Sequence, residues 1–231
     1  MLVAQRNQQA EQQWRRQRCD DLLALLLSDA GDSPRLIDEA QQLGLKPQMN
    51  RVPYLFELGM EQGPGHTVEA LSAWLTSRHP DSWCISSGKS SLLWCRPASQ
   101  AVEHERLLEK LDGLGWNILR IAVGEQAEGL SGLRRCNRQV GDLLAYGRDV
   151  VPRTRLLTLN RYRLPVMLWR HRNDDALDDL LKPLRKVIAK DGNGQLLATL
   201  RSWCEHDGQS QACADALGIH RNSLRYRMER I

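Results

Sequence analysis

The end of the chain shows the clearest periodic pattern of apolar and polar residues. Leu224, Met228 and Ile231 are spaced i, i+4 and i+7, which places them on one face of a helix. Gly218 precedes this helix, at a point where a backbone with positive φ is typical of a helix end. The pattern therefore predicts two helices joined by a tight turn. The first ends near Leu217 and the second runs from the turn to Ile231.

A third helix is expected just before this pair. Apolar residues at 196, 197, 200 and 203 share one face of a helix that begins near Gln195, and residues 206–208 end it. The next helix begins at Ser210 or Gln209. Three short helices with this spacing predict an all-α, trihelical helix-turn-helix domain over residues 195–231, an arrangement that binds DNA.

Residues 34–172 alternate between strand patterns and helix patterns. The order of strand, helix, hairpin, helix, strand and helix predicts an α+β fold, an α/β sandwich of the ferredoxin-like or cyclase-palm type. Residues 154–159 add a candidate edge strand, and a helical region starts over 164–171. Strands are expected at 52–58, 83–86, 91–95 and 117–123, and helices at 67–77, 102–114 and 131–146.

Helical segments are expected on both sides of this region. Residues 2–28 predict a helix that is polar as far as Arg18 and strongly apolar over 22–27, within an N-terminal connecting segment of residues 1–33. Docking of its apolar end on the next domain is favoured over a dimeric coiled coil, because no heptad repeat is sustained. Residues 173–194 are expected to form a helical linker, with a break at 191–194.

Ser33 and Pro34 open the helix that begins the middle domain. Ser33 suits the N-cap and Pro34 the first turn, and Gly44 is expected to end this helix.

Composition and charge restrict the possible domain number and function only a little. The chain has 231 residues, 42% of them hydrophobic, which is enough for one large or two small domains. The net charge of +4 does not by itself indicate a nucleic-acid partner, but four arginines and a single acid lie between Gly218 and Ile231. The six cysteines lack metal-binding spacing and predict reduced thiols. No signal peptide or membrane span is visible, so a cytoplasmic protein without a membrane partner is expected.

The residues from Leu217 to Ile231 carry a family resemblance. Their sequence, Leu-Gly-Ile-His-Arg-Asn-Ser-Leu-Arg-Tyr-Arg-Met-Glu-Arg-Ile, resembles the PucR-type helix-turn-helix of the sugar-diacid (carbohydrate diacid) regulator family and, more distantly, Fis-type helices. The resemblance implies a GGDEF-like domain near residues 35–170, related to the palm of diguanylate cyclases. It also implies a bacterial-type regulator that activates genes for the uptake and catabolism of glucarate, galactarate or glycerate. The other segments that resemble this family are 43–45, 122–124, 164–168 and 191–203.

Two features depart from that family. Its members usually begin with a diacid-sensing domain, and none precedes Met1. They also usually continue past the recognition helix, whereas this sequence stops at Ile231. The sequence is therefore expected to be a fragment or the product of a shortened gene, without an effector-sensing domain and with a truncated helix-turn-helix domain.

The polar face of the last helix carries the candidate DNA contacts. Arg221, Asn222 and Arg225 are expected to read bases, because asparagine matches adenine and arginine matches guanine in bidentate geometry. The partner is double-stranded DNA, and because one such motif contacts few base pairs, a homodimer on paired operator half-sites is expected. Contacts shared between bases and phosphates are assigned to His220, Ser223, Tyr226 and Arg227. The domain core is assigned to Leu217, Ile219, Leu224 and Met228.

No catalytic, cofactor or metal site is predicted elsewhere. Residues 86–91, Ser-Ser-Gly-Lys-Ser-Ser, lack the first glycine of a phosphate-binding loop and lead into a strand, so they predict a hairpin turn. The G-G-[DE]-[DE]-F turn of catalytic cyclase palms is absent, which predicts a degenerate scaffold or a dimerisation module. Two other functions stay open at this point: a nucleotide-sensing or enzymatic cyclase-like protein, and an adaptor that does not bind DNA.

Overall fold

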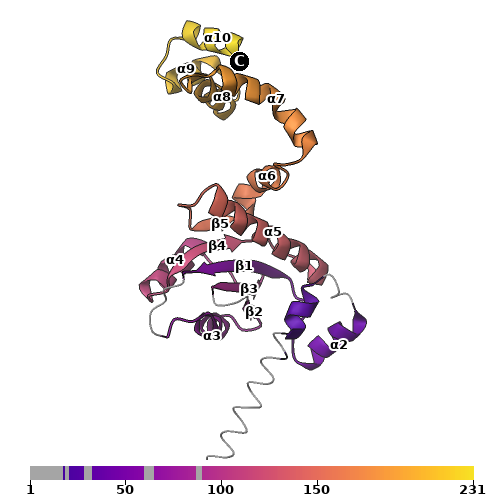
Figure 1. Cartoon of the computed structure of the whole chain (residues 1–231). Coiled ribbons are helices and arrows are strands. Elements are labelled where there is room, and N and C mark those ends of the chain that lie inside the picture. The colour runs from indigo at the N-terminus through magenta and orange to yellow at the C-terminus, as the bar shows by residue number, and fades with distance from the viewer. Residues whose placement is uncertain (1–17, 19–20, 29–32, 60–64, 87–89) are drawn as a thin grey trace, which may run out of the picture. The chain divides into compact units, whose positions relative to one another are not determined.

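The chain forms two compact units, divided between Trp169 and Arg170. The computed structural model describes residues 18, 21–28, 33–59, 65–86 and 90–231 (Figure 1). The first unit is a sheet covered by helices, and the second is entirely helical. This confirms the predicted α+β fold class with an all-α domain at the end of the chain.

A five-stranded sheet organises the first unit, in the order β2-β3-β1-β4-β5. The neighbouring pairs from β2 to β4 are antiparallel, and β5 is parallel to β4. The first four strands have the order of a ferredoxin-like β-α-β-β-α-β unit, and β5 is the edge strand expected at 154–159. The strands are β1 (Arg51–Leu58), β2 (Trp83–Ser86), β3 (Ser91–Pro97), β4 (Ile118–Val123) and β5 (Leu156–Thr158).

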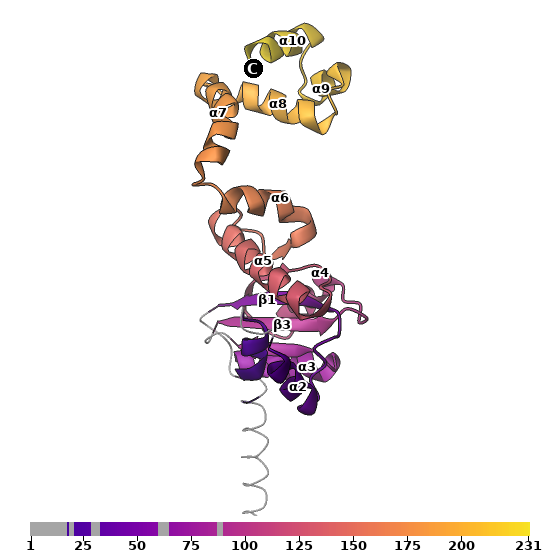
Figure 2. The same cartoon turned by 90° about the vertical axis from the view of Figure 1, so that its right-hand side faces the viewer.

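Helices cover both faces of this sheet (Figures 1 and 2). Two helices, α3 (Val68–Arg78) and α4 (His104–Gly113), pack on one face. The helix α5 (Gly129–Asp149) packs on the other, together with α2 (Pro34–Gln42) and the helical residues 21–26. Leu22, Leu23 and Leu26 join this second cluster, so the apolar end of the N-terminal segment docks on the sheet domain, as the sequence favours.

The alternation of side chains along β1 explains the first of these clusters. Tyr54 and Phe56 point to the face covered by α3 and α4, and both are completely buried. Trp94 on β3 is equally buried, and its ring centroid lies 4.8 Å from that of Tyr54. Aromatic contacts of this kind add to the stabilisation from burial alone. A cluster of buried aromatic rings therefore holds the centre of the sheet against α3 and α4.

Arg51, the first residue of β1, is buried with its charge. Its guanidinium stacks on the ring of Trp83 at 3.8 Å and donates hydrogen bonds to the carbonyl oxygens of Asp81 and Cys95. Desolvation lowers the pKa of Arg51 to about 10, so the side chain remains charged at neutral pH. The predicted strand started one residue later, because a charged residue gives no apolar signal in the sequence.

A polar cluster joins α3 and α4 to the same end of β1. The Tyr54 hydroxyl lies 3.1 Å from Nδ1 of His104 and accepts a hydrogen bond from Nε of Arg96 at 3.2 Å. His79, which follows α3, has its Nδ1 3.1 Å from Oε1 of Gln100. Desolvation is the main cause that lowers the pKa of both His79 and His104, and the nearby Arg96 lowers them further.

Several helices begin or end a few residues away from the predicted position. The helix expected from 102 begins at His104, and the helix expected over 131–146 runs from Gly129 to Asp149 because Tyr146 and Gly147 are buried in the unit. The helical region expected from 164 begins at Leu159, as α6 (Leu159–Arg170), because Leu159 is buried in the sheet cluster. The predicted hairpin turn at 87–89 and the helix expected over residues 2–17 lie outside the described residues.

The second unit consists of four helices. The first of them, α7, fills most of the segment for which a helical linker is expected, and it packs against α8. Among the helices that the structure describes, none is long and apolar enough to cross a membrane. The bounds are α7 (Asp175–Lys190), α8 (Gln195–Glu205), α9 (Ser210–Ala216) and α10 (Arg221–Arg230).

Candidate nucleic-acid interface

Three helices, α8, α9 and α10, close around a small apolar core. Cys213, Ala214 and Leu224 are buried almost completely, and Ala214 supplies the small side chain where α9 and α10 cross. The residues that pack against this cluster are partly exposed, and they are Trp203, Leu217, Ile219 and Met228. The four residues assigned to the core from the sequence all take part.

The turn between α9 and α10 is fixed by backbone hydrogen bonds. Gly218 has φ +62°, and its N–H donates to the carbonyl of Asp215 at 3.1 Å. The N–H of Ile219 donates to the carbonyl of Ala214 at 3.0 Å, which completes a Schellman motif. His220 then caps α10, because its Nδ1 accepts a hydrogen bond from the N–H of Asn222 at 3.2 Å. The start of α10 is thus set by residues that the sequence assigned to the turn and to DNA contacts.

The start of α8 is held by Asp191. Its carboxylate accepts hydrogen bonds from the N–H groups of Leu196 at 3.0 Å and Leu197 at 2.9 Å. Desolvation would raise the pKa of Asp191, but backbone hydrogen bonds from Leu197, Leu196 and Gln195 and the nearby Arg230 outweigh it, so that the pKa is lowered. Because Arg230 lies near the end of α10, this carboxylate connects the first and last helices of the motif electrostatically.

The predicted DNA contacts lie on the solvent side of α10. Asn222 and Tyr226 lie roughly 160–200° around the helix from the buried Leu224, given 100° per residue. Tyr226 is 61% exposed. Arg227 is the exception among the seven, since it is half-buried at the flank next to Asp191. The other six residues are exposed, and they are His220, Arg221, Asn222, Ser223, Arg225 and Tyr226.

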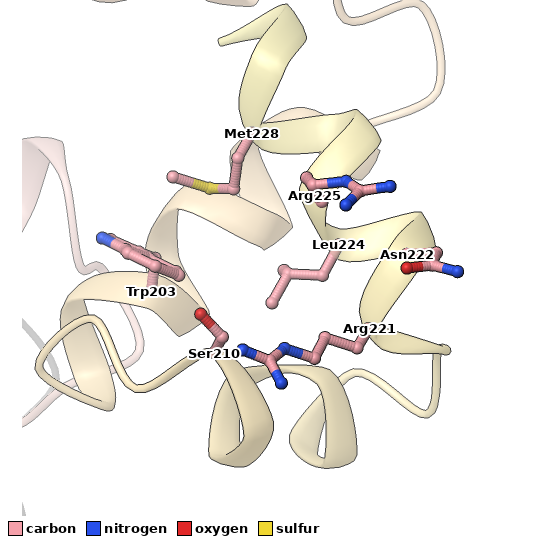
Figure 3. Close-up of a pocket in the computed structure, with 7 residues that line it drawn as sticks. All are labelled: Trp203, Ser210, Arg221, Asn222, Leu224, Arg225 and Met228. Atoms are coloured by element: carbon pink, nitrogen blue, oxygen red, sulfur yellow. The ribbon is translucent and has the colours of Figure 1, made fainter.

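A groove of about 410 Å³ runs beside α10, between it and the other two helices (Figure 3). Its floor is apolar, with Leu224, Met228 and the ring of Trp203. Figure 3 shows the Arg221 side chain extending towards Ser210, while Asn222 points outward from the helix. The groove thus places guanidinium groups and a hydroxyl around an apolar floor, a combination suited to a phosphate and the sugar attached to it.

Sequence reasoning missed two residues of this groove. Trp203 was assigned only to the apolar face of its helix, and Ser210 only to the start of the next helix. Neither has a periodic signal that connects it to Arg221, because the three residues come from three different helices. Glu229, on the exposed side of α10, is the only acid of that helix and was not assigned a role.

The first unit offers no comparable constellation among its described residues. Glu57, near the end of β1, forms ion pairs with Arg120 at 2.8 Å and Arg148 at 2.7 Å. In the described part of the chain, no group of three or more histidine, cysteine, aspartate or glutamate residues is arranged to hold a metal ion. Glu57, the one acid within β1, is thus paired with arginines.

Two family models match the chain. Residues 28–146 match the GGDEF-like domain, and residues 196–231 match the PucR C-terminal helix-turn-helix domain. The first match coincides with the sheet unit up to α5, and the second with the three helices around Leu224.

Individual proteins are also similar to the chain. The carbohydrate diacid regulator of Escherichia coli K12 is 27% identical over 227 residues, which covers 92% of this chain and 59% of that protein. An uncharacterised protein in the pkwA 5′ region of Thermomonospora curvata is 33% identical over 133 residues, 55% of this chain and 67% of that protein. The crystal structure of a regulator of polyketide synthase expression from Bifidobacterium adolescentis superposes with a TM-score of 0.51 at 15% identity, covering 92% of this chain and 82% of that one. This last likeness concerns the fold alone.

Proposed function

Because the chain belongs to the family that combines a GGDEF-like domain with a PucR C-terminal helix-turn-helix domain, we propose that it is a transcription regulator that binds operator DNA through α10. The observation that carries the proposal is the division of α10 into two faces. Leu224 fixes the helix to α8 and α9, while Asn222 on the opposite side and Arg221 and Arg225 on the flanks are exposed to solvent. A helix of this kind fits the major groove of DNA, where arginine and asparagine distinguish bases.

The positions on α10 suggest different roles for its polar residues. Asn222 and Arg225 lie on the exposed side of the helix and are proposed to contact base edges. Arg221 extends over the groove towards Ser210, which suits a contact to the DNA backbone (Figure 3). His220 caps the helix, so we assign it a positioning role in addition to its proposed contact with DNA. The remaining proposed contacts are Ser223, Tyr226 and Arg227.

The regulated genes are proposed from the relative's name. The chain spans 59% of the length of the carbohydrate diacid regulator that it matches. We propose that this protein activates genes for the use of sugar diacids such as glucarate, galactarate or glycerate, and that it acts in the cytoplasm as a homodimer on paired half-sites. The sheet unit is proposed to act as a scaffold without catalytic activity, since Glu57 is paired with two arginines and no G-G-[DE]-[DE]-F turn is present in the sequence.

A DNA-binding titration at fixed salt tests the role of α10. The substitutions Asn222→Ala and Arg225→Ala are each expected to weaken specific binding by about 1–3 kcal/mol. Arg221→Ala is expected to weaken binding to operator and to unrelated DNA alike and to reduce the salt dependence of the affinity. Arg106→Ala on α4 removes an exposed arginine of the sheet unit and is the control. Unchanged operator affinity in both Asn222→Ala and Arg225→Ala would contradict the proposal.

Calorimetry tests the scaffold role of the sheet unit. The whole protein, titrated with GTP and with cyclic dinucleotides, is expected to give no stoichiometric heat. A heat of binding with a defined stoichiometry would instead support a nucleotide-sensing function of the GGDEF-like domain.

A further inference from the structure

We propose that α7 is a dimerisation helix that pairs with α7 of a second copy of this chain in antiparallel orientation. The first observation is an apolar stripe along one side of the helix. Leu177, Leu181, Leu184 and Ile188 follow one another at intervals of four, three and four residues. This is the spacing of the contact residues in a short coiled coil. Within the second unit α7 packs against α8, and its buried residue, Val187, lies near the C-terminal end of this stripe.

The stripe is only partly covered within the second unit, all of whose residues are described. Val187, near the end that meets α8, is the single buried residue of α7. Ile188 is 47% exposed, and Leu180, at the edge of the stripe, is 71% exposed. Apolar side chains at such regular spacing, in a helix otherwise rich in charge, are typical of a surface that a partner covers.

The charges of α7 select a second copy as that partner and fix its direction. The first half of the helix and its N-cap are acidic, with Asp174, Asp175, Asp178 and Asp179. The second half is basic, with Lys182, Arg185, Lys186 and Lys190. Two parallel copies would bring acid against acid and base against base. Two antiparallel copies bring the acidic half of each helix against the basic half of the other.

The apolar stripe and the charges agree on one register. When Leu177 faces Ile188 of the second copy, Leu181 faces Leu184, and all four stripe residues pair. In this register Asp178 flanks the stripe opposite Arg185 of the second copy. The same two residues already form an ion pair within one helix, so pairing exchanges their partners without leaving a charge unpaired. Leu180 is then placed on the opposite flank, next to Val187 of the second copy.

This arrangement has a consequence for DNA that rests on the proposed function. The 16 residues of α7 span about 24 Å. Antiparallel pairing places the two helix-turn-helix motifs at opposite ends of the paired helices. Half-sites about one turn of DNA apart, roughly 34 Å, are therefore expected rather than adjacent half-sites.

The experiment is sedimentation analysis of the whole chain without DNA, so that its result does not depend on operator binding. Asp178→Arg places arginine opposite arginine at both ends of the pair, and Arg185→Asp places acid opposite acid. Each variant alone is expected to weaken the dimer about tenfold, because two exposed ion pairs become repulsive. An equimolar mixture of the two variants is expected to recover dimerisation, since each then meets the opposite charge in its partner.

Matched controls on the outer side of α7 separate pairing from general charge effects. Asp179→Arg and Lys186→Asp make the same charge changes roughly opposite the stripe, and are expected to leave the dimer unchanged. Leu181→Ala with Leu184→Ala is expected to give a monomer whose thermal unfolding matches that of the wild-type chain at monomeric concentrations. A wild-type chain that remains monomeric overturns the proposal, as does a dimer indifferent to these variants. Loss of stability in a monomeric Leu181→Ala, Leu184→Ala chain would show that the stripe is covered within one chain, which also overturns it.

Discussion

The two units of this protein use their charged residues in opposite ways. In the sheet unit, Arg51 and Arg96 are buried and donate hydrogen bonds to carbonyl groups, and Glu57 is enclosed by two arginines. In the helical unit, the small cluster of Cys213, Ala214 and Leu224 supports a helix whose arginines mostly face solvent. Charges that are bound within a fold stabilise one arrangement, whereas exposed charges remain free to bind a ligand. The smaller unit is therefore the one expected to recognise a partner.

The largest effect is expected from the sheet. Phe56→Ala removes a fully buried ring from the cluster that α3 and α4 cover, and it is expected to cost about 3–5 kcal/mol of unfolding free energy in the first unit. Hydrogen exchange of individual amides measures the two units separately. Protection of the α10 amides is expected to stay at its wild-type level. Equal loss of protection in both units would show that they unfold together and would remove the contrast between them.

The small core of the helix-turn-helix is expected to be nearly as sensitive. Leu224→Ala removes the largest of its three buried side chains and is expected to cost about 2–5 kcal/mol. Since Leu224 is the buried residue that holds α10 in this cluster, DNA binding should be lost while the sheet unit keeps its exchange protection. Operator titration combined with amide exchange checks both parts. Retained DNA binding would mean that α10 is held by more than this cluster.

The turn before α10 is expected to show a smaller effect. Gly218→Ala forces a residue with a Cβ into φ +62°, which costs roughly 1–2 kcal/mol. The added Cβ has no atom within 4 Å, so the cost comes from the backbone and not from a clash. Gly192→Ala adds a Cβ with equal space and without a positive φ, and its thermal unfolding should match that of the wild type. Equal behaviour of the two variants would contradict this account of the turn.

The smallest expected effect is a pH dependence that comes from two histidines of the sheet unit. The folded unit lowers the pKa of His79 and His104 below the ordinary value of 6.5, mainly by desolvation, so the unfolded chain binds more protons. Stability is therefore expected to fall as the pH drops below about 6.5, until the lower pKa of the folded state is passed. Denaturant unfolding at a series of pH values should show this slope. His79→Gln with His104→Gln should flatten it, and an unchanged slope in that variant would refute the assignment.

Much of the fold follows from apolar spacing, and its limits have physical causes. The alternation over 52–58 and the i, i+4, i+7 spacing at Leu224, Met228 and Ile231 identify a strand and a helix because each buries one face. Arg51 escaped prediction because its burial depends on Trp83 and on distant carbonyl groups. Helix ends were less predictable, since α5 extends to Asp149 through contacts of Tyr146 with Tyr162 and Trp169.

The candidate site also has features that follow from the sequence and features that do not. One helical period is enough to separate the core residue Leu224 from its exposed neighbours on α10, so the polar face could be derived from the sequence. The groove could not, because Trp203, Ser210 and Arg221 meet only after three helices have folded together. The capping role of His220 was also hidden, since the same side chain is polar enough to suit a DNA contact.

The contact between Asp191 and the end of α10 has a practical consequence for protein engineering. Lys190 and Asp191 line one small hollow together with Arg227 and Arg230, so the polypeptide enters and leaves the helix-turn-helix at the same corner. Asn222 lies at the other end of α10, about 12 Å along the axis from Arg230. A fluorescent label or an affinity tag fused to Ile231 therefore emerges beside the end of α7, away from Asn222. Such fusions offer a way to immobilise the protein while leaving the proposed DNA contacts accessible.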